Sequence, residues 1–255
     1  MKNLTLVLLT LFITTIASAK CGNNDITCLT KSSTLNKNGL IILEFYAESQ
    51  SLIPELNNKY PIYLKSSNKK VQLTIIETLK GEMSLTQIVL KPSSALKANE
   101  VYTLVIDNLP VYERTPARYN STTKKWEAPT FKITNTVDTE IPTISNTPTE
   151  NKKTLVEYGC GPGSWVYFDM VGQDNSELFV RASVKNKATG QTTTYILGIE
   201  NGLVKVGHGM CSGAFHFNGS TNFEATFQLF DQSGNKSAKS EVITFAKPAF
   251  VTSEE

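Results

Sequence analysis

The stretch Phe223-Glu-Ala-Thr-Phe-Gln-Leu-Phe230 decides the fold class. Its apolar residues alternate with polar ones, so Phe223, Ala225, Phe227 and Leu229 fall on one face of an extended chain. This period of two predicts a β-strand with one face toward a core, because an amphipathic helix would repeat its apolar residues about every 3.6 positions. The turn-forming stretch Asp231-Gln-Ser-Gly-Asn235 follows directly and ends the predicted strand.

The same pattern recurs along most of the chain. We predict strands at 40–45, 60–64, 71–75, 86–90, 101–106, 130–134, 164–169, 178–184, 193–197, 203–206, 214–217, 223–230 and 241–245. Turns rich in Asn, Gly and Pro separate these runs, and no sustained amphipathic helix interrupts them. Short strands at close spacing predict an all-β protein made of antiparallel β-sandwiches.

A polar, threonine-rich segment divides the strands into two groups. Asn135-Thr-Val-Asp-Thr-Glu-Ile-Pro142 interrupts the alternation, and we place a domain boundary near Asp138. The chain is 255 residues long, so each half has about the 100 residues that one sandwich domain usually needs. We therefore predict two tandem β-sandwich domains, at 20–137 and 138–255.

The first 19 residues are typical of a cleaved secretory signal peptide. Met1 and Lys2 precede an apolar run, and Ala17-Ser18-Ala19 then supplies the small residues of a cleavage site. The run is shorter than the roughly 20 apolar residues of a membrane span, so we expect none. The protein is predicted to be exported to the periplasm, the cell surface or the medium. Lipidation of Cys21 is a minor alternative, because Lys20 stands where a lipoprotein signal needs a small residue.

The predicted mature chain contains four cysteines: Cys21, Cys28, Cys160 and Cys211. An even number of cysteines in an exported chain predicts disulfides. Four cysteines allow three pairings, and locality favours Cys21–Cys28 and Cys160–Cys211, because each pair then lies within one predicted domain. His208 and His216 flank Cys211, but no paired motif of zinc-site spacing exists, so we predict no metal site.

Composition and motifs argue against several classes of function. Lys plus Arg is 25 and Asp plus Glu is 23, a formal charge of +2 that gives no electrostatic footprint for nucleic acid. The glycine-rich stretch 159–163 lacks the lysine of a phosphate loop, and neither histidine stands in a hydrolase or metalloprotease motif. We therefore predict no catalytic centre and no cofactor. A hydrolase built on the dispersed carboxylates Glu44, Glu48, Asp169 and Asp174 stays open as a third reading.

Two further features are interpreted as structural. Trp165 lies in a run with Val166, Tyr167 and Phe168, and we expect it in the core. The oxygens of Asp231-Gln-Ser-Gly-Asn235 could bind calcium, but Asp and Asn at these places also favour a plain turn, and we predict the turn.

Two stretches carry a resemblance to known modules. Leu90-Lys-Pro-Ser-Ser-Ala-Leu96, followed by Asn99-Glu-Val-Tyr-Thr-Leu-Val-Ile106, resembles the end of a bacterial Ig-like domain. The second half opens with Asp138-Thr-Glu-Ile-Pro142 and closes near Asp231–Ser237, and it is similar to Ig-like or fibronectin-III-like modules of bacterial exported proteins. The resemblance implies a role at the cell surface, in adhesion or as a spacer.

The segment 110–129 is the predicted recognition site. It is longer than the 2–6 residues usual for a connection in a compact domain. The residues expected to contact a ligand are Tyr112, Arg114, Arg118, Tyr119 and Trp126. Aromatic and arginine side chains are frequent binding anchors, because they bury large areas at little entropic cost. The alternative is an extended hairpin that packs its tryptophan back on its own domain.

These features together predict a non-catalytic exported binding or adhesion protein that recognises a cell-surface glycan or an envelope protein through its loops. The alternative is a structural spacer or envelope assembly component without a ligand site.

Overall fold

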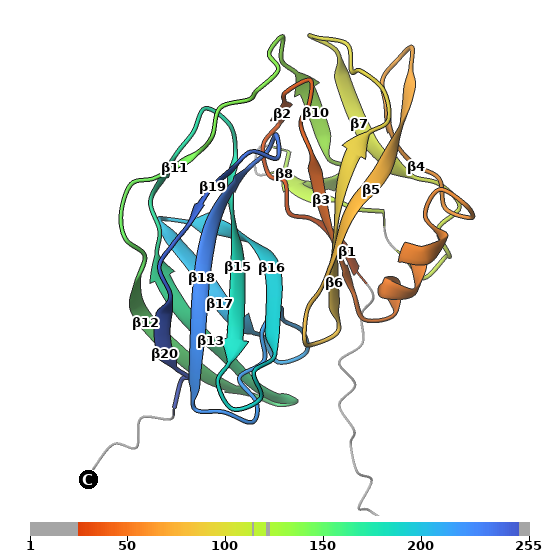
Figure 1. The fold of residues 1–255 in the computed structure, drawn as a ribbon. Helices are drawn as coiled ribbons and strands as arrows, with labels where there is room; N and C mark the ends of the chain where they lie inside the picture. Colours follow the sequence, from red (N-terminus) through yellow and green to blue (C-terminus); the bar gives the residue numbers. More distant parts are fainter. Residues whose placement is uncertain (1–24, 114, 121–122, 250–255) are drawn as a thin grey trace, which may run out of the picture.

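The computed structural model describes residues 25–113, 115–120 and 123–249. Its strands form two β units that lie side by side in Figure 1. The predicted signal peptide and Cys21 lie outside the described residues. Within them, the only helix is the short 3₁₀ segment η1 (Ala47–Glu55), and no helix is long and apolar enough to cross a membrane.

The first unit is one sheet of eight strands with the order β1-β3-β6-β5-β4-β7-β10-β2. The strands are β1 (Asp25–Cys28), β2 (Thr34–Leu35), β3 (Ile41–Tyr46), β4 (Ile62–Lys65), β5 (Lys70–Lys80), β6 (Leu85–Pro92), β7 (Val101–Ile106) and β10 (Thr130–Ile133). The long strand β5 pairs with β4 through its first residues and with β6 through the rest, with a bulge between Ile75 and Glu77. The sheet therefore folds over at β5 and encloses an apolar core.

The second unit repeats this plan. Its strands are β12 (Thr149–Tyr158), β13 (Gly161–Asp169), β15 (Leu178–Asn186), β16 (Thr192–Glu200), β17 (Leu203–His208), β18 (Asn222–Asp231), β19 (Lys236–Lys239) and β20 (Ile243–Ala246). Their order is β12-β13-β17-β16-β15-β18-β19, and β20 pairs with β18. Strand β16 pairs with β15 over most of its length and with β17 at its end. A small sheet of β11 (Thr143–Ile144) and β14 (Gly172–Gln173) borders this unit. The predicted boundary near Asp138 lies between β10 and β11 and stays a prediction.

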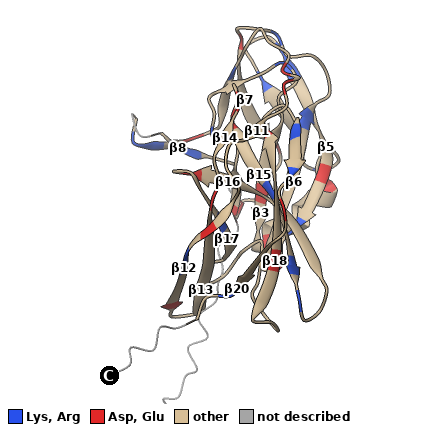
Figure 2. Ribbon diagram, turned by 60° about the vertical axis from the view of Figure 1, so that its left-hand side comes forward, with Lys and Arg blue, Asp and Glu red and all other residues tan. Residues whose placement is uncertain are grey.

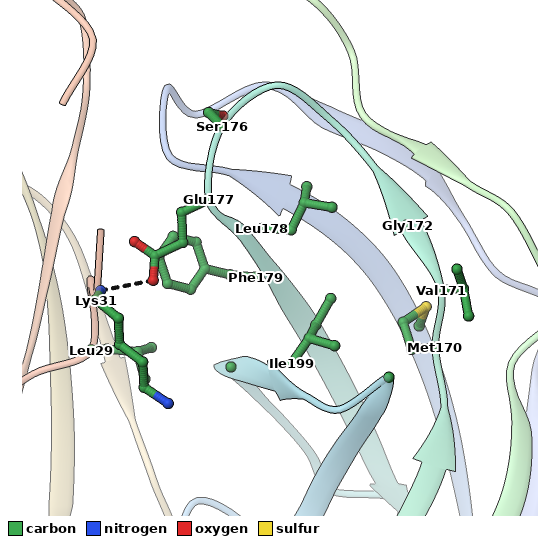
Figure 3. A pocket seen from close by; sticks show the side chains of 12 residues that line it. Leu29, Lys31, Met170, Val171, Gly172, Ser176, Glu177, Leu178, Phe179 and Ile199 are labelled. Carbon is green, nitrogen blue, oxygen red and sulfur yellow. Dashed lines mark hydrogen bonds between the residues drawn. The ribbon is translucent and has the colours of Figure 1, made fainter. Parts of the chain in front are cut away.

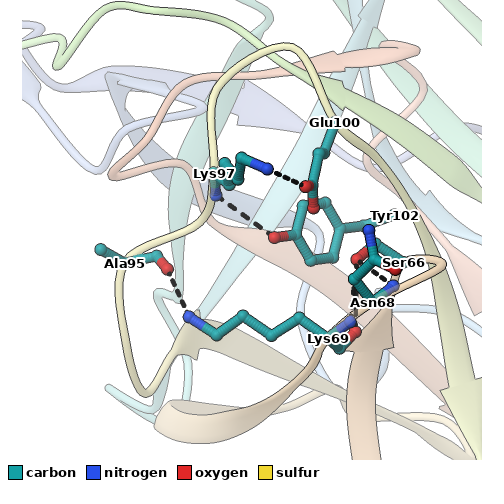
Figure 4. A network of polar contacts seen from close by, with 7 residues as sticks. All are labelled: Ser66, Asn68, Lys69, Ala95, Lys97, Glu100 and Tyr102. Atoms are coloured by element: carbon teal, nitrogen blue, oxygen red, sulfur yellow. Dashed lines mark hydrogen bonds and ion pairs between the residues drawn. The ribbon is translucent and has the colours of Figure 1, made fainter.

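A buried tyrosine fixes the loop before β7 (Figure 4). The hydroxyl of Tyr102 accepts a hydrogen bond of 3.2 Å from the backbone N–H of Lys97, five residues upstream. This resembles the tyrosine corner of Ig-like sandwiches, in which a tyrosine near a strand start bonds back to the preceding backbone. Lys97 also pairs with Glu100 at 2.8 Å, and Lys69 of the adjacent turn donates to the Ala95 carbonyl at 3.1 Å. The Ig-like turn chemistry expected in this stretch thus has a structural counterpart.

Strand β3 and its neighbour β6 are buried on both faces. Ile41 and Leu43 belong to the core of the first unit, whereas Ile42 belongs to the core that also contains the second unit's Phe227 and Val180. Both faces of β3 are covered, because the second unit packs against the outer face of the first. This explains the nearly unbroken apolar run in β3, which is typical of strands without a solvent-facing side.

Polar contacts set the register of this interface. The side-chain amide of the buried Gln87 in β6 donates to the Ile196 carbonyl at 3.0 Å and accepts from the Ile196 N–H at 3.1 Å. Arg181 on β15 forms a two-point ion pair with Glu77 on β5. Partial burial of either charged side chain, Arg181 or Glu77, would be costly without the other as its partner. The two β units are therefore joined by a specific, partly polar surface rather than by a linker alone.

Glu44 makes this interface sensitive to pH. Burial raises the pKa of its carboxyl group, although Tyr195, Thr27 and Gln87 lie beside it as hydrogen-bonding neighbours that favour the charged form. Because the pKa of Glu44 is higher in the folded than in the unfolded protein, its contribution to stability is greatest below the unfolded pKa of about 4.3. That contribution is lost as the pH rises through the folded pKa. We expect urea unfolding at a series of pH values to show this loss in the native protein. Glu44→Gln should not show it, and an equal pH dependence in both proteins would contradict the assignment.

Both predicted disulfides are wrong. No disulfide joins two of the described residues, and Cys28 carries a free thiol. Cys160 lies exposed in the turn between β12 and β13, and no disulfide links it to Cys211. Closeness in sequence does not bring the sulfur atoms together, because Cys28 faces Arg118 instead, with its thiol 3.6 Å from the guanidinium.

Two other expectations are also wrong. The stretch 214–217 is not a strand, although Ala214, Phe215 and Phe217 are buried; it is a loop packed into the core of the second unit. Trp165 does not lie in the core, because the residues that β13 contributes to the apolar core are Val166 and Phe168. Their neighbours Trp165 and Tyr167 therefore point to the opposite face.

Candidate functional site

The segment singled out in the sequence forms a hairpin. Strand β8 (Arg118–Asn120) pairs with β9 (Lys125–Glu127), and Tyr119 stands opposite Trp126. Figure 2 shows β8 extending sideways from the sheets, with Lys and Arg in blue. Trp126 is 72% exposed, and Tyr112, which precedes the hairpin, is 69% exposed. Such exposed aromatic side chains are candidates for contact with a partner.

Hydrogen bonds order the end of this hairpin. Glu127 accepts from the Thr123 hydroxyl at 2.5 Å and from the Asn120 amide at 2.8 Å. These two hydrogen bonds hold the pKa of the Glu127 carboxyl below its usual range, and the bond from Thr123 has the larger effect. An ordered hairpin loses less conformational entropy on binding than a flexible loop would.

Arg118 anchors the hairpin to the first unit. Its guanidinium donates to the backbone carbonyls of Lys31 at 2.9 Å and Ser32 at 3.1 Å. The guanidinium also lies 4.8 Å from the ring centre of Phe131 and donates to the Cys28 thiol. Burial raises the pKa of this thiol, and the positive charge of Arg118 offsets part of that rise. Arg118 thus directs both terminal nitrogens of its guanidinium into the fold, and in this structure it positions the hairpin.

A groove begins where the hairpin is anchored (Figure 3). Its first pocket, of about 430 Å³, lies between the first unit's Leu29–Lys31 and the second unit's sheet. A second pocket of about 320 Å³ shares Leu29, Lys31 and Gly198 with the first and continues toward Tyr167 and Lys205. Because Arg118 bonds to the Lys31 carbonyl, the hairpin and the groove share one segment of backbone.

Two carboxylates of the groove have partners in the segment Lys31–Ser32. Glu177 accepts from the backbone N–H groups of Lys31 at 2.7 Å and Ser32 at 2.9 Å. The Lys31 ammonium pairs with Glu200 at 2.6 Å and lowers the pKa of that carboxyl. Among the described residues that line the two pockets, no histidine or cysteine accompanies these carboxylates. These ionised groups stabilise the contact between the two units.

An acidic cluster is the group best able to hold a metal. Carboxylate oxygens of Asp138, Asp174 and Asp231 lie within 4.8 Å of one another. Burial, and then the charge of Asp138, raise the pKa of Asp231, against its hydrogen bonds to Asn235. Asp231 accepts from the N–H groups of Ser233 at 2.9 Å and Asn235 at 2.7 Å, as the predicted turn requires. These protein donors already satisfy the buried carboxylate, and we assign no metal to the cluster.

The two histidines lie together. The rings of His208 and His216 meet edge to face with centres 4.8 Å apart, and the His208 Nδ1 is 2.9 Å from the Gly209 carbonyl. Burial and the neighbouring His208 lower the pKa of His216. Strand β17 and the loop that follows it therefore bring the two histidines into contact.

The structure brings together only part of the predicted site. Trp126 and Tyr112 are exposed, Tyr119 occupies a hairpin position, Arg118 points inward, and Arg114 lies outside the described residues. The sequence did not indicate the groove, because Lys31 and Glu177 are 146 positions apart and neither belongs to a motif. Asp174, suggested as one of the dispersed carboxylates of a hydrolase, gathers instead with Asp138 and Asp231.

Comparisons with known proteins place the chain in no family. No family model matches the sequence, and no curated protein matches it. Among solved structures, it is similar to a pullulanase from Anoxybacillus sp. LM18-11, with 10% identity and a TM-score of 0.25 over 84% of this chain and 25% of that one. This chain therefore spans about a quarter of the pullulanase's length.

Two other solved structures match this chain at a similarly low level. The tandem Ig repeats of Dlar match 86% of this chain and 96% of theirs, at 10% identity and a TM-score of 0.26. The Yersinia pseudotuberculosis adhesin InvE matches 88% of this chain and 60% of its own, at 12% identity and a TM-score of 0.21. With TM-scores this low, we base no argument on these likenesses.

Proposed function

We propose that this protein is an exported, non-catalytic recognition module that binds a cell-surface glycan or an envelope protein through the β8–β9 hairpin. The proposal rests on the exposure of two aromatic side chains together with the anchoring of the hairpin to the first unit. Trp126 and Tyr112 are largely exposed, and Arg118 fixes the base of the hairpin with three hydrogen bonds. Rigidly held aromatic side chains are the usual energetic centres of binding surfaces.

Truncation of the two exposed aromatics tests this proposal. Trp126→Ala with Tyr112→Ala should weaken binding to immobilised glycans or envelope fragments by about tenfold or more, because each anchor contributes on the order of 1–2 kcal/mol. The matched control is Ile141→Ala with Val242→Ala, which removes apolar side chains that are 65% and 58% exposed elsewhere. Circular dichroism and thermal unfolding establish that both proteins are folded. Equal binding by the two variants would contradict the hairpin site.

A structural spacer is the second candidate. It is favoured by the interface between the two β units, in which Gln87, Arg181 and Glu77 fix one unit against the other. A spacer gains from such rigidity, whereas a recognition module does not require it. If neither the native protein nor any variant binds glycans or envelope fragments, the spacer becomes the better account.

A further inference from the structure

The outer face of the second unit carries aromatic rings and lysines in a row. On β13, Trp165 and Tyr167 alternate with the buried Val166 and Phe168 and so face away from the core. Across the sheet, Tyr167 stands opposite Lys152 of β12 on one side and Lys205 of β17 on the other. With Tyr158 at the end of β12, these residues form what we call the aromatic–lysine strip: Lys152, Tyr158, Trp165, Tyr167 and Lys205.

Glycines make the strip flat. A side chain at Gly163 would place its first carbon 2.3 Å from the Trp165 indole and 2.9 Å from the Tyr158 ring, so both rings lie over this residue. The residue opposite Trp165 on β17 is Gly207, which also leaves room beside the indole. Trp165 therefore rests on backbone, with Tyr158 beside it, in an arrangement that presents ring surface outward.

The lysines give the strip a positive charge. The Lys205 ammonium lies 3.9 Å from the ring centre of Trp165, and the Lys152 ammonium lies 4.9 Å from that of Tyr167. Neither lysine forms an ion pair with a carboxylate within the described parts of the chain. Cation–π contacts at exposed sites are weak, so an anionic ligand can draw these ammonium groups away from the rings.

We propose that the aromatic–lysine strip binds an acidic polysaccharide. The apolar faces of sugar rings stack on Trp165 and Tyr167, while sugar carboxylates pair with Lys152 and Lys205. The strip continues into the groove, because Tyr167 and Lys205 also line its second pocket. A glycan chain suits this open row better than a globular partner, since Trp165 and Tyr167 follow one another along β13 and a lysine flanks Tyr167 on each neighbouring strand. The strip shares no residue with the hairpin, and the proposal does not depend on the hairpin's function.

Tryptophan fluorescence can follow binding at the strip and at the hairpin separately. Trp126 and Trp165 are the only tryptophans in the chain. In Trp126→Phe, fluorescence therefore reports on the strip alone, and in Trp165→Phe on the hairpin alone. We expect polygalacturonate, a polymer of uronic acid, to change the emission of Trp126→Phe in a saturable manner. The change should diminish with added salt, because salt screens exposed charges. Neutral dextran should produce a much smaller change.

Removal of the lysines tests the charge pairing. In the Trp126→Phe background, Lys152→Gln with Lys205→Gln should weaken polygalacturonate binding by about tenfold or more, because it removes two charge-assisted contacts. Lys80→Gln with Lys132→Gln removes the same charge from exposed positions of the first unit and should change affinity by about twofold at most.

Three results would overturn the proposal. One is an unchanged Trp165 emission with polygalacturonate, and another is an equal loss of affinity in the two double variants. The third is tighter binding of single-stranded oligothymidylate than of polygalacturonate, which would indicate nucleic acid instead. A response of Trp126 in Trp165→Phe concerns only the hairpin, so failure of one site is distinguishable from failure of the other.

Discussion

Gln87→Ala is expected to lower the free energy of unfolding by about 3 kcal/mol. The Gln87 side chain is fully buried and satisfies both the N–H and the carbonyl of Ile196. Truncation would leave two backbone groups without partners at the interface, and each such group costs about 1–3 kcal/mol. It would also remove a 3.4 Å contact to the carboxylate of Glu44. Urea denaturation followed by fluorescence measures the loss.

Gln72→Ala is the matched control for this change. Gln72 lies on β5 of the same sheet, but its side chain is exposed. Its truncation should change the free energy of unfolding by less than about 0.5 kcal/mol, as is usual at exposed positions. If Gln87→Ala were as mild as Gln72→Ala, the two units would not depend on this polar contact, and the interface would rest on apolar packing alone.

Gly207→Ala should also destabilise the protein by about 3 kcal/mol. Gly207 has φ of +142°, a conformation that residues with a side chain rarely adopt. A methyl group there would lie 2.1 Å from the Ser164 carbonyl oxygen and 2.9 Å from the Trp165 Cα. Strands β13 and β17 would have to separate where they pair. Thermal unfolding should show the loss, and the emission of Trp165 should shift because the strand that carries it moves.

Gly159→Ala provides the control for Gly207. Gly159 lies in the turn before β13, where an added side-chain carbon would meet nothing within 4 Å and where φ is not in the left-handed region. It should therefore leave the free energy of unfolding within about 0.5 kcal/mol of the native value. Equal effects at the two glycines would show that the close approach of β13 and β17 is relaxed at little cost.

The strands with a clear core face could be predicted from the sequence, and those at exposed edges could not. The run 223–230 corresponds to β18, and 101–106 to β7, because alternation along each strand reports which side is buried. Strand β12 was missed, because it is an edge strand with mostly exposed polar residues and hydrogen-bonds to one neighbour only. The opposite error occurred at 214–217, where apolar residues fill the core from a loop. Hydrophobicity reports burial there, not backbone conformation.

The hairpin could be predicted as a feature, but not the roles of its residues. An excess of aromatic and basic residues between two strands indicated an unusual connection at 110–129. Whether a given side chain faces solvent depends on contacts with distant segments. Arg118 turns inward because carbonyls of Lys31 and Ser32 are available to it, almost 90 positions away. Trp165 turns outward because its alternate neighbours fill the core.

Sequence patterns alone predict the β class, the positions of most core strands and the turn at Asp231, because these follow from local alternation and from local hydrogen bonding. The tertiary structure alone decided how the two β units meet, and with it the groove, the acidic cluster and the partner of Gln87. It also decided that Cys28 faces Arg118 rather than another cysteine. The groove and the contacts of Gln87 and Cys28 join residues 90 to 146 positions apart. Such contacts depend on the packing of whole sheets, which no local pattern of residues encodes.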